Sequence, residues 1–315
     1  MASRGGGARA AFTRAQVLAY RAAAHELEAG VDRPGRCAVL AVGVRDTGPR
    51  RLSRLALRAR VVPGAMTASA DPLADPDLTL VHSVRGAMHL HRGADLPMVR
   101  LAVRLRDAAD TTPASFGPFA GELAAAGGAL GDALDEVSAA MRAVMADGRA
   151  RTKGELSGEV TPRLDRRLCP WCEGCGVFHP QDALFRYATL QAGLCLDADQ
   201  RFTRSPYLDA VAAHADGSVD AARRELARRF LHLCGPATHH RLAAWLAIPP
   251  AAARRLLDAI DDVVDVTVDG RRGWMVAPDL DAVATAPPPV AVRLLPAYDP
   301  LTEIADRELL VPDSA

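Results

Sequence analysis

Residues 238–277, THHRLAAWLAIPPAAARRLLDAIDDVVDVTVDGRRGWMVA, change from a helical to a strand-like pattern within one continuous stretch. Leu242, Trp245 and Leu246 stand at the spacing of one helical face, and a Pro-Pro pair separates this helix from a second one over 251–263. Alternating valines then lead into an Asp-Gly turn, which is the pattern of a β-hairpin. The stretch therefore predicts two helices followed by a hairpin.

A further helix is predicted directly upstream, over 220–235, where apolar residues recur at helical spacing. Three helices and a hairpin in this order make a winged helix-turn-helix unit, whose third helix and hairpin, or wing, approach DNA. The third helix here carries Arg254 and Arg255, and Arg271 lies at the tip of the wing. Because winged helices also serve as protein-contact modules or spacers, this order of elements leaves DNA binding open.

A second unit of the same kind is predicted in the middle of the chain. An amphipathic helix over 131–148 is followed by Thr152 and Glu155 in capping-box spacing, which predicts the start of another helix. The sequence then becomes strand-like around Leu184 and Phe185.

The remaining unit, nearest the N-terminus, is less regular, with a helix from residue 13 and a hairpin-like stretch over 77–97. We therefore expect a mainly α-helical protein with small β-hairpins, built from three tandem winged helix-turn-helix units. The expected units and the segment that follows them span 1–112, 113–222, 223–290 and 291–315.

The composition is that of a globular protein without membrane segments. The 315 residues carry zero formal net charge, and 49% are hydrophobic and 24% charged. No apolar run approaches the ~20 residues of a membrane span, and residues 1–16 lack the apolar block of a signal peptide. The six cysteines are not spaced as a disulfide framework. We expect a cytoplasmic monomer with no membrane attachment, in which residues 1–16 form a flexible basic leader.

Positive charge is concentrated between residues 45 and 60, where the only acidic residue is Asp46. The arginines in this stretch are Arg45, Arg50, Arg51, Arg54, Arg58 and Arg60. A basic face on a neutral protein fits a polyanion such as double-stranded DNA, and Arg50, Arg51 and Arg54 are the candidates for DNA contacts. The alternative is a solvated helix face with no partner.

Several segments occur in the order found in one bacterial family. They are GVRDTG (43–48), HSVRGAMHLHRGADLP (82–97), TKGELSG (152–158), ALFRYATLQAGL (183–194), CGPATHHRLAAWLAI (234–248) and LLPAYDPLTEIADRELLVPD (294–313). Together they resemble the bacterial winged-helix DNA-binding-domain family that includes the AlkZ-like DNA glycosylases, which unhook interstrand crosslinks. The resemblance covers nearly the whole chain from about residue 14. It implies three winged helices that embrace DNA, no cofactor, and, for characterised members, cleavage of the N-glycosidic bond.

The resemblance places the catalytic motif of the family at residues 45–47. Glycosylases of the family carry Gln-x-Gln or Gln-x-Asp there, whereas this chain has Arg45, Asp46 and Thr47. Arg85 and His89 match an Arg-Gly-x-x-His segment that lies near the catalytic strand, where a histidine can contact a phosphate or position a water. A histidine bonded to the hairpin backbone is the structural alternative. The family also continues into a small C-terminal β-domain, of which 291–315 is expected to be a shortened remnant.

The departure at this motif matters because of the reaction. Cleavage of an N-glycosidic bond develops positive charge on the sugar, and the site must stabilise that charge and position a water. Gln accepts and donates hydrogen bonds, whereas Arg only donates and is always charged. Asp46 is a candidate base, although an extended backbone points it away from the face that Arg45 and Thr47 share.

Four hypotheses therefore stand. The first is a DNA-binding relative with weak or no excision, and the second is an active glycosylase for bulky alkylated bases that uses Asp46. The third is a non-catalytic DNA-binding regulator or resistance protein, and the fourth is a wing-mediated protein-interaction module.

CPWCEGCGVFHP, residues 169–180, places Cys169, Cys172, Cys175 and His179 within eleven residues. Soft and borderline ligands at this spacing suit zinc, and the three cysteines also resemble an iron–sulfur run. One compact run strains tetrahedral geometry, however, so we take free thiols without a metal as the expectation.

Overall fold

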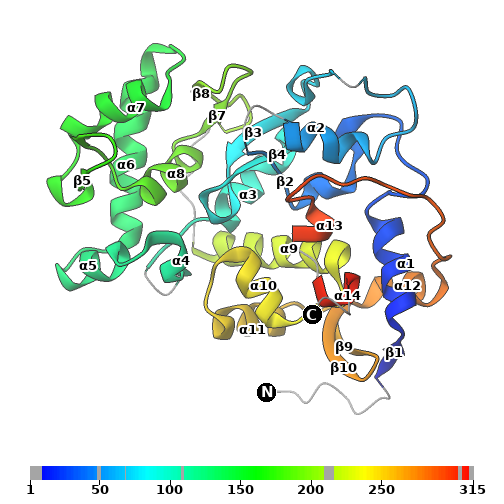
Figure 1. Ribbon diagram of the computed structural model, residues 1–315. Helices are drawn as coiled ribbons and strands as arrows, with labels where there is room; N and C mark the ends of the chain where they lie inside the picture. Colours follow the sequence, from blue (N-terminus) through cyan, green and yellow to red (C-terminus); the bar gives the residue numbers. More distant parts are fainter. Residues whose placement is uncertain are drawn as a thin grey trace.

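Groups of α-helices alternate with short β-sheets along the chain (Figure 1). The computed structural model describes residues 9–47, 51–67, 69–107, 110–208, 216–303 and 307–311. The α-helices are α1 (Arg14–Ala24), α2 (Arg51–Arg58), α3 (Leu96–Ala102), α4 (Pro113–Phe116), α5 (Phe119–Ala125), α6 (Leu130–Val144), α7 (Lys153–Val160), α8 (Asp182–Gln191), α9 (Asp216–Cys234), α10 (His239–Leu246), α11 (Pro250–Asp258), α12 (Leu280–Thr285), α13 (Pro300–Glu303) and α14 (Arg307–Leu310). The strands are β1 (Ala10–Phe12), β2 (Val44–Arg45), β3 (Leu78–His82), β4 (Met88–Arg92), β5 (Trp171–Cys172), β6 (Val177–Phe178), β7 (Leu194–Leu196), β8 (Phe202–Arg204), β9 (Val263–Val268) and β10 (Arg271–Val276). Among the described residues, no helix has both the length and the apolar character to cross a lipid bilayer.

A five-stranded sheet in the order β2-β4-β3-β7-β8 links the first two groups of helices. β3 and β4 form the antiparallel hairpin predicted within 77–97. Leu80 at the centre of β3 pairs with Leu90 on one side and with Leu196 of β7 on the other. All three leucines are buried in a core that α6 and α8 also line. The sheet thereby fixes the Arg85 turn of the hairpin relative to α6 and α8.

The C-terminal helices follow the predicted order, since α9, α10 and α11 precede the antiparallel hairpin β9–β10. Asp269 and Gly270 both have positive φ, 46° and 79°, as a two-residue turn of type I′ requires. Leu242 and Trp245 are buried as their spacing predicts, and the Thr238 side chain caps α10 by accepting the backbone N–H of Arg241. Local sequence therefore specifies this part of the fold.

Residues 10–24 pack on the C-terminal helices rather than forming a flexible leader. β1 pairs in parallel with β9, with Ala10 opposite Val266, and α1 contacts α9 and α12. Phe12 and Tyr20 are buried in the small core beneath this sheet. The leader prediction is wrong for residues 9–16, and residues 1–8 lie outside the described part of the chain.

The starts of two helices in the middle of the chain show one prediction confirmed and one wrong. Thr152 and Glu155 form the predicted capping box at the start of α7. The strand predicted around Leu184 and Phe185 is instead helix α8, which begins where the Gln181 side chain accepts the backbone N–H of Leu184 at 2.8 Å. Burial of both apolar side chains against α6 outweighs the strand preference of the aromatic residues.

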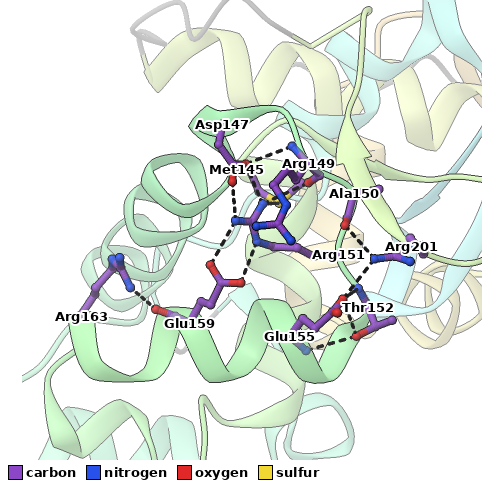
Figure 2. A network of polar contacts seen from close by, with 10 residues as sticks. All are labelled: Met145, Asp147, Arg149, Ala150, Arg151, Thr152, Glu155, Glu159, Arg163 and Arg201. Atoms are coloured by element: carbon purple, nitrogen blue, oxygen red, sulfur yellow. Dashed lines mark hydrogen bonds and ion pairs between the residues drawn. The ribbon is translucent and has the colours of Figure 1, made fainter.

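In the polar network of Figure 2, Arg151 links Asp147, in the turn that follows α6, to Glu159 of α7. Its guanidinium donates two 2.8 Å hydrogen bonds to Asp147 and bonds of 3.0 and 3.1 Å to Glu159. Its backbone exchanges two hydrogen bonds with Phe202 of β8. Because the Arg151 side chain is only 7% exposed, the two carboxylates compensate its charge where water does not. The network therefore holds the turn between α6 and α7 against the five-stranded sheet.

After α12 the chain runs back past α1 and α2 without regular structure and ends in α13 and α14 (Figure 1). Arg293 donates to the backbone oxygen of Leu27 at 2.6 Å, and Asp299 accepts two 2.7 Å hydrogen bonds from Arg60. In the described part of 291–311 the regular elements are these two short helices, and no strand is present. The segment from 287 to 303 is thus tied to the N-terminal third of the chain.

Candidate functional site

β2 occupies only residues 44 and 45 of the GVRDTG stretch. The preceding residues 38–41 form a 3₁₀ turn, and Gly43 has a φ of +90°, so the extended backbone starts late. Arg45 pairs with His89 across the sheet. The side chains of residues 45–47 differ in exposure: Arg45 is half-buried, Asp46 is buried and Thr47 is exposed. Arg45 and Thr47 thus face outward while Asp46 faces the protein interior.

Arg45 meets the C-terminal segment, as α13 lies beside β2 (Figure 1). Its guanidinium donates a 2.5 Å hydrogen bond to Oε1 of Glu303 and lies 4.2 Å from the centre of the Tyr298 ring. Arg85 donates to the same Glu303 oxygen at 2.6 Å. The Glu303 side chain is only 13% exposed, so one largely buried carboxylate bridges two arginines, one of which lies in the stretch where the resemblance places the family's catalytic motif. Sequence reasoning missed Glu303 because it lies 258 positions from Arg45.

The Asp46 carboxylate is buried and hydrogen-bonded within the fold. Only 1% of its surface is exposed, and its Oδ1 accepts the backbone N–H of Ser53, in the first turn of α2, at 3.3 Å. Its own N–H donates to the backbone oxygen of Met88 at 3.0 Å. A carboxylate at a helix N-terminus satisfies a backbone donor and complements the helix dipole. The position of Asp46 explains how α2 begins, and it gives solvent no approach to the carboxylate.

His89 lies beneath the sheet surface, with only 2% of its area exposed. Its Nδ1 is 2.9 Å from the backbone oxygen of Ala87 and 3.1 Å from Oγ of Ser83, which also lies 2.9 Å from Nε2 of His91. Burial lowers the pKa of His89 well below its ordinary value, and the neighbouring His91 adds to this. Burial also lowers the pKa of His91 to about 4. A neutral, enclosed imidazole cannot make a direct phosphate contact, and its geometry is that of the backbone-bonded alternative.

The arginine cluster divides between the surface and the interior. Arg50 lies outside the described residues, and Arg51 starts α2 with its side chain undescribed. Arg54 is half-buried and Arg58 is exposed. Arg60, by contrast, is fully buried against Asp299, so the expectation of one basic face over 45–60 is wrong at this residue. Its position just beyond the end of α2 points it toward the protein core.

Arg254 and Arg255 of α11 and Arg271 of β10 are exposed. Arg254 forms an ion pair with Asp258 at 3.0 Å, and its guanidinium stacks 4.8 Å from the ring centre of Trp274. Arg255 and Arg85 line the same cavity of about 310 Å³. Arg271 lies at the start of β10, beside the turn of the β9–β10 hairpin.

Arg85 lies in the β3–β4 turn, beside hollows that α8, α9, α10 and α11 also line. It has a φ of 59° in the β3–β4 turn, and its side chain is 28% exposed. Besides the cavity that it shares with Arg255, it lines a wider hollow of about 830 Å³, whose walls include Arg186 of α8 and His240 of α10. Ile248 lines both spaces, so they adjoin at the Arg85 turn. Arg85, which Glu303 links to Arg45, thus borders both hollows.

Comparison with known families decides the relationship of the chain. The family model described as "DNA glycosylase AlkZ-like" matches residues 39–315. The chain belongs to the AlkZ-like DNA glycosylase family. The Streptomyces sahachiroi DNA glycosylase AlkZ has a similar fold, with a TM-score of 0.71 and 20% identity over 96% of this chain and 80% of that chain. Comparison with curated protein sequences yields no match.

Away from this region, the AlkZ-like chain brings together three of the four residues in its cysteine run. One ligand atom from each of Cys172, Cys175 and His179 lies within 4.8 Å of the others. Cys169 is not in this group, because it is buried at the end of a preceding 3₁₀ turn. The four-residue set considered from spacing is therefore reduced to three.

Proposed function

We propose that this chain is a duplex-DNA-binding protein of the AlkZ-like family whose own base excision is weak or absent. The observation that carries the proposal is the bridge from Glu303 to Arg45 and Arg85, at the place where family glycosylases present a glutamine. With it we propose the three tandem winged helix-turn-helix units, over 1–112, 113–222 and 223–290. The supporting observation is that helices precede antiparallel hairpins in the middle and C-terminal units.

The charges around β2 suit phosphate better than a cationic sugar. Arg45 and Arg85 carry two positive charges, and Glu303 supplies one negative charge, so the trio keeps a net charge of +1. Both guanidiniums donate hydrogen bonds and accept none. A developing oxocarbenium ion would be repelled by the net charge and would lack the acceptor that Gln provides. The same charge attracts a DNA backbone.

The alternative of an active glycosylase that uses Asp46 is not favoured by its position. A general base must reach the attacking water within hydrogen-bond distance. Asp46 is 1% exposed and already accepts the Ser53 N–H at the start of α2. Its substitution is therefore expected to affect the stability of α2 rather than the rate of excision.

The DNA surface we propose comprises Arg45 and Arg85 at the centre, the exposed side of α2, and the last helix and wing. The candidate contacts are Arg50, Arg51, Arg54, Arg85, Arg254, Arg255 and Arg271. Their positive charge, on a chain of zero net charge, suits a polyanion. We propose further that the protein acts in the cytoplasm as a monomer, on double-stranded DNA that is alkylated or crosslinked.

Base release from alkylated duplex DNA tests the catalytic part of the proposal. Arg45→Gln combined with Thr47→Gln removes the misplaced charge and restores the acceptors, so excision should rise ~100- to 1000-fold, the size of effect typical of one active-site group. Glu303 keeps Arg85 as a partner in this variant, which preserves the fold. Arg36→Gln, which alters an exposed arginine paired with Asp32, is the control. Rapid excision by the unmodified chain that Asp46→Asn abolishes would establish the alternative instead.

Duplex binding as a function of salt tests the DNA-binding part. Removing one phosphate contact should reduce the slope of log affinity against log salt by about 0.9. The triple change of Arg50, Arg51 and Arg54 to Ala should therefore weaken binding and flatten the slope. Changing the exposed Arg33 and Arg36 to Ala serves as the control, since both are paired with aspartates elsewhere on the surface. Unchanged affinity and slope in the triple variant would remove the α2 side from the DNA surface.

A further inference from the structure

A small hairpin projects from the middle unit between α7 and α8, and it holds the three converging ligand atoms. β5 and β6 pair through only two positions, Trp171 with Phe178 and Cys172 with Val177. Trp171, Val177 and Phe178 are 47%, 50% and 44% exposed. A two-stranded hairpin of this length with no buried apolar face is marginal in water. The hairpin therefore needs a source of stability other than the packing of its apolar side chains.

The turn of this hairpin presents its two cysteines on one side. The backbone N–H groups of Cys175 and Gly176 both donate to the carbonyl oxygen of Cys172, at 3.2 and 2.8 Å. Gly176 closes the turn with a φ of +65°, a conformation that favours glycine. The spacing C-x₂-C is typical of two cysteine ligands of a structural zinc ion.

His179 directly follows β6, the second strand of the hairpin, and lies near Cys172 and Cys175. Its Nδ1 lies 2.7 Å from the backbone oxygen of Pro180 and so carries the proton, which leaves Nε2 with a free lone pair. Metal-bound histidines characteristically donate their other ring N–H to a carbonyl or carboxylate in this way. The base of the hairpin is held by the Gln181 N–H, which donates to the Leu168 oxygen at 2.9 Å. The histidine is therefore held in a tautomer that leaves Nε2 able to bind a metal.

We propose that Cys172, Cys175 and His179 bind one zinc ion, which staples this hairpin to the N-terminus of α8. The ligand atoms already lie within 4.8 Å of one another, and tetrahedral zinc with Zn–S bonds of about 2.3 Å needs separations of about 3.8 Å. Rotation of the exposed Cys175 side chain supplies this contraction of about 1 Å. Cys169 is 4% exposed and stands outside the group, so a water molecule takes the fourth position, on the solvent side where Cys175 is exposed.

Metal analysis of the full-length protein, purified under reducing conditions without chelator, tests the site. We expect about one equivalent of zinc in the unmodified chain and in Cys169→Ser, and a loss of at least about tenfold in zinc occupancy in Cys172→Ser and His179→Gln. Cys195→Ser and His240→Gln, which change a buried cysteine and an exposed histidine elsewhere, should keep the metal. Circular dichroism of each variant separates loss of metal from loss of fold.

Cobalt substitution gives a second measurement that does not depend on expression conditions. Protein depleted of zinc and titrated with Co²⁺ should show thiolate-to-metal charge-transfer and tetrahedral d–d absorption, and Cys172→Ser should abolish both. The proposal is overturned if the reduced chain binds neither ion, if Cys172→Ser keeps a full equivalent, or if Cys172 and Cys175 form a disulfide whose reduction restores no metal binding.

Discussion

Arg60 and Asp299 form a bidentate ion pair, with both N···O distances at 2.7 Å and both side chains fully buried. Arg60 also donates to the carbonyl oxygen of Ala56 at 2.7 Å, so the guanidinium is held on two sides. Asp299 belongs to the C-terminal segment, four residues before Glu303. The pair therefore anchors the segment that places Glu303 against Arg45.

The first prediction concerns this anchor. Asp299→Ala leaves Arg60 charged and buried without its partner, and breaking a buried pair in this way typically costs about 3–5 kcal/mol in the free energy of unfolding. The measurement is urea denaturation, with Asp32→Ala as control, because Asp32 pairs with Arg36 on the exposed surface. The control should lose no more than about 1 kcal/mol. Replacing both partners, as Arg60→Met with Asp299→Leu, should recover most of the loss, and equal losses in Asp299→Ala and Asp32→Ala would contradict the anchoring role.

The second prediction concerns the bridging carboxylate. Glu303→Gln removes the negative charge shared by Arg45 and Arg85, so both guanidiniums become available to phosphate. Duplex affinity should increase, and the salt slope should steepen by about 0.9 for each additional phosphate that the arginines neutralise. Glu122→Gln changes an exposed carboxylate on α5 and is expected to leave both quantities unaltered. An affinity that does not rise in Glu303→Gln would mean that these arginines do not face DNA.

The predictions that succeeded from sequence are those that local patterns specify. The helices and hairpin over 220–277 follow from a change of apolar period and an Asp-Gly turn, and Thr152 marks the start of α7 by its own hydrogen bond. The prediction at Leu184 failed because local strand preference was outweighed by burial on α6, an interaction that no nearby residue indicates.

The candidate site was predictable only in part, for the same reason. Resemblance to the family located residues 45–47, but Glu303 reaches Arg45 from 258 positions away. The clustering of arginines along the chain does not distinguish exposed Arg58 from buried Arg60, because the difference lies in what each residue packs against. Strand β1 was missed likewise, since its three residues are extended only through pairing with β9.

The third prediction is a pH dependence from the buried imidazoles. Burial lowers the pKa of His91 to about 4, against about 6.5 in the unfolded chain. Between these values the unfolded chain binds more protons, so the stability contribution is fully present above a pH of about 6.5 and falls as the pH drops toward about 4. In this range the slope of unfolding free energy against pH that His91 contributes approaches about 1.4 kcal/mol per pH unit.

His91→Gln tests this assignment, since it removes the titrating group and should flatten the plot of unfolding free energy against pH between about 6.5 and about 5. His240→Gln alters an exposed histidine and should leave the slope as it is. Equal slopes for His91→Gln and the unmodified chain would show that His91 does not stay neutral in the fold.

The last prediction concerns Gly43, which leads into β2. Its φ of +90° disfavours any side chain, and a Cβ added there would lie 2.6 Å from Cε1 of His91 and 3.1 Å from Cβ of His89. Gly64 has nearly the same φ, +87°, but nothing lies within 4 Å of an added Cβ. Gly64→Ala should therefore cost only the backbone term of about 1–2 kcal/mol, whereas Gly43→Ala should cost about 1–3 kcal/mol more through the forced displacement of His91. Urea denaturation of the two variants isolates the steric term, and equal losses would mean that the imidazoles do not pack under β2 as described.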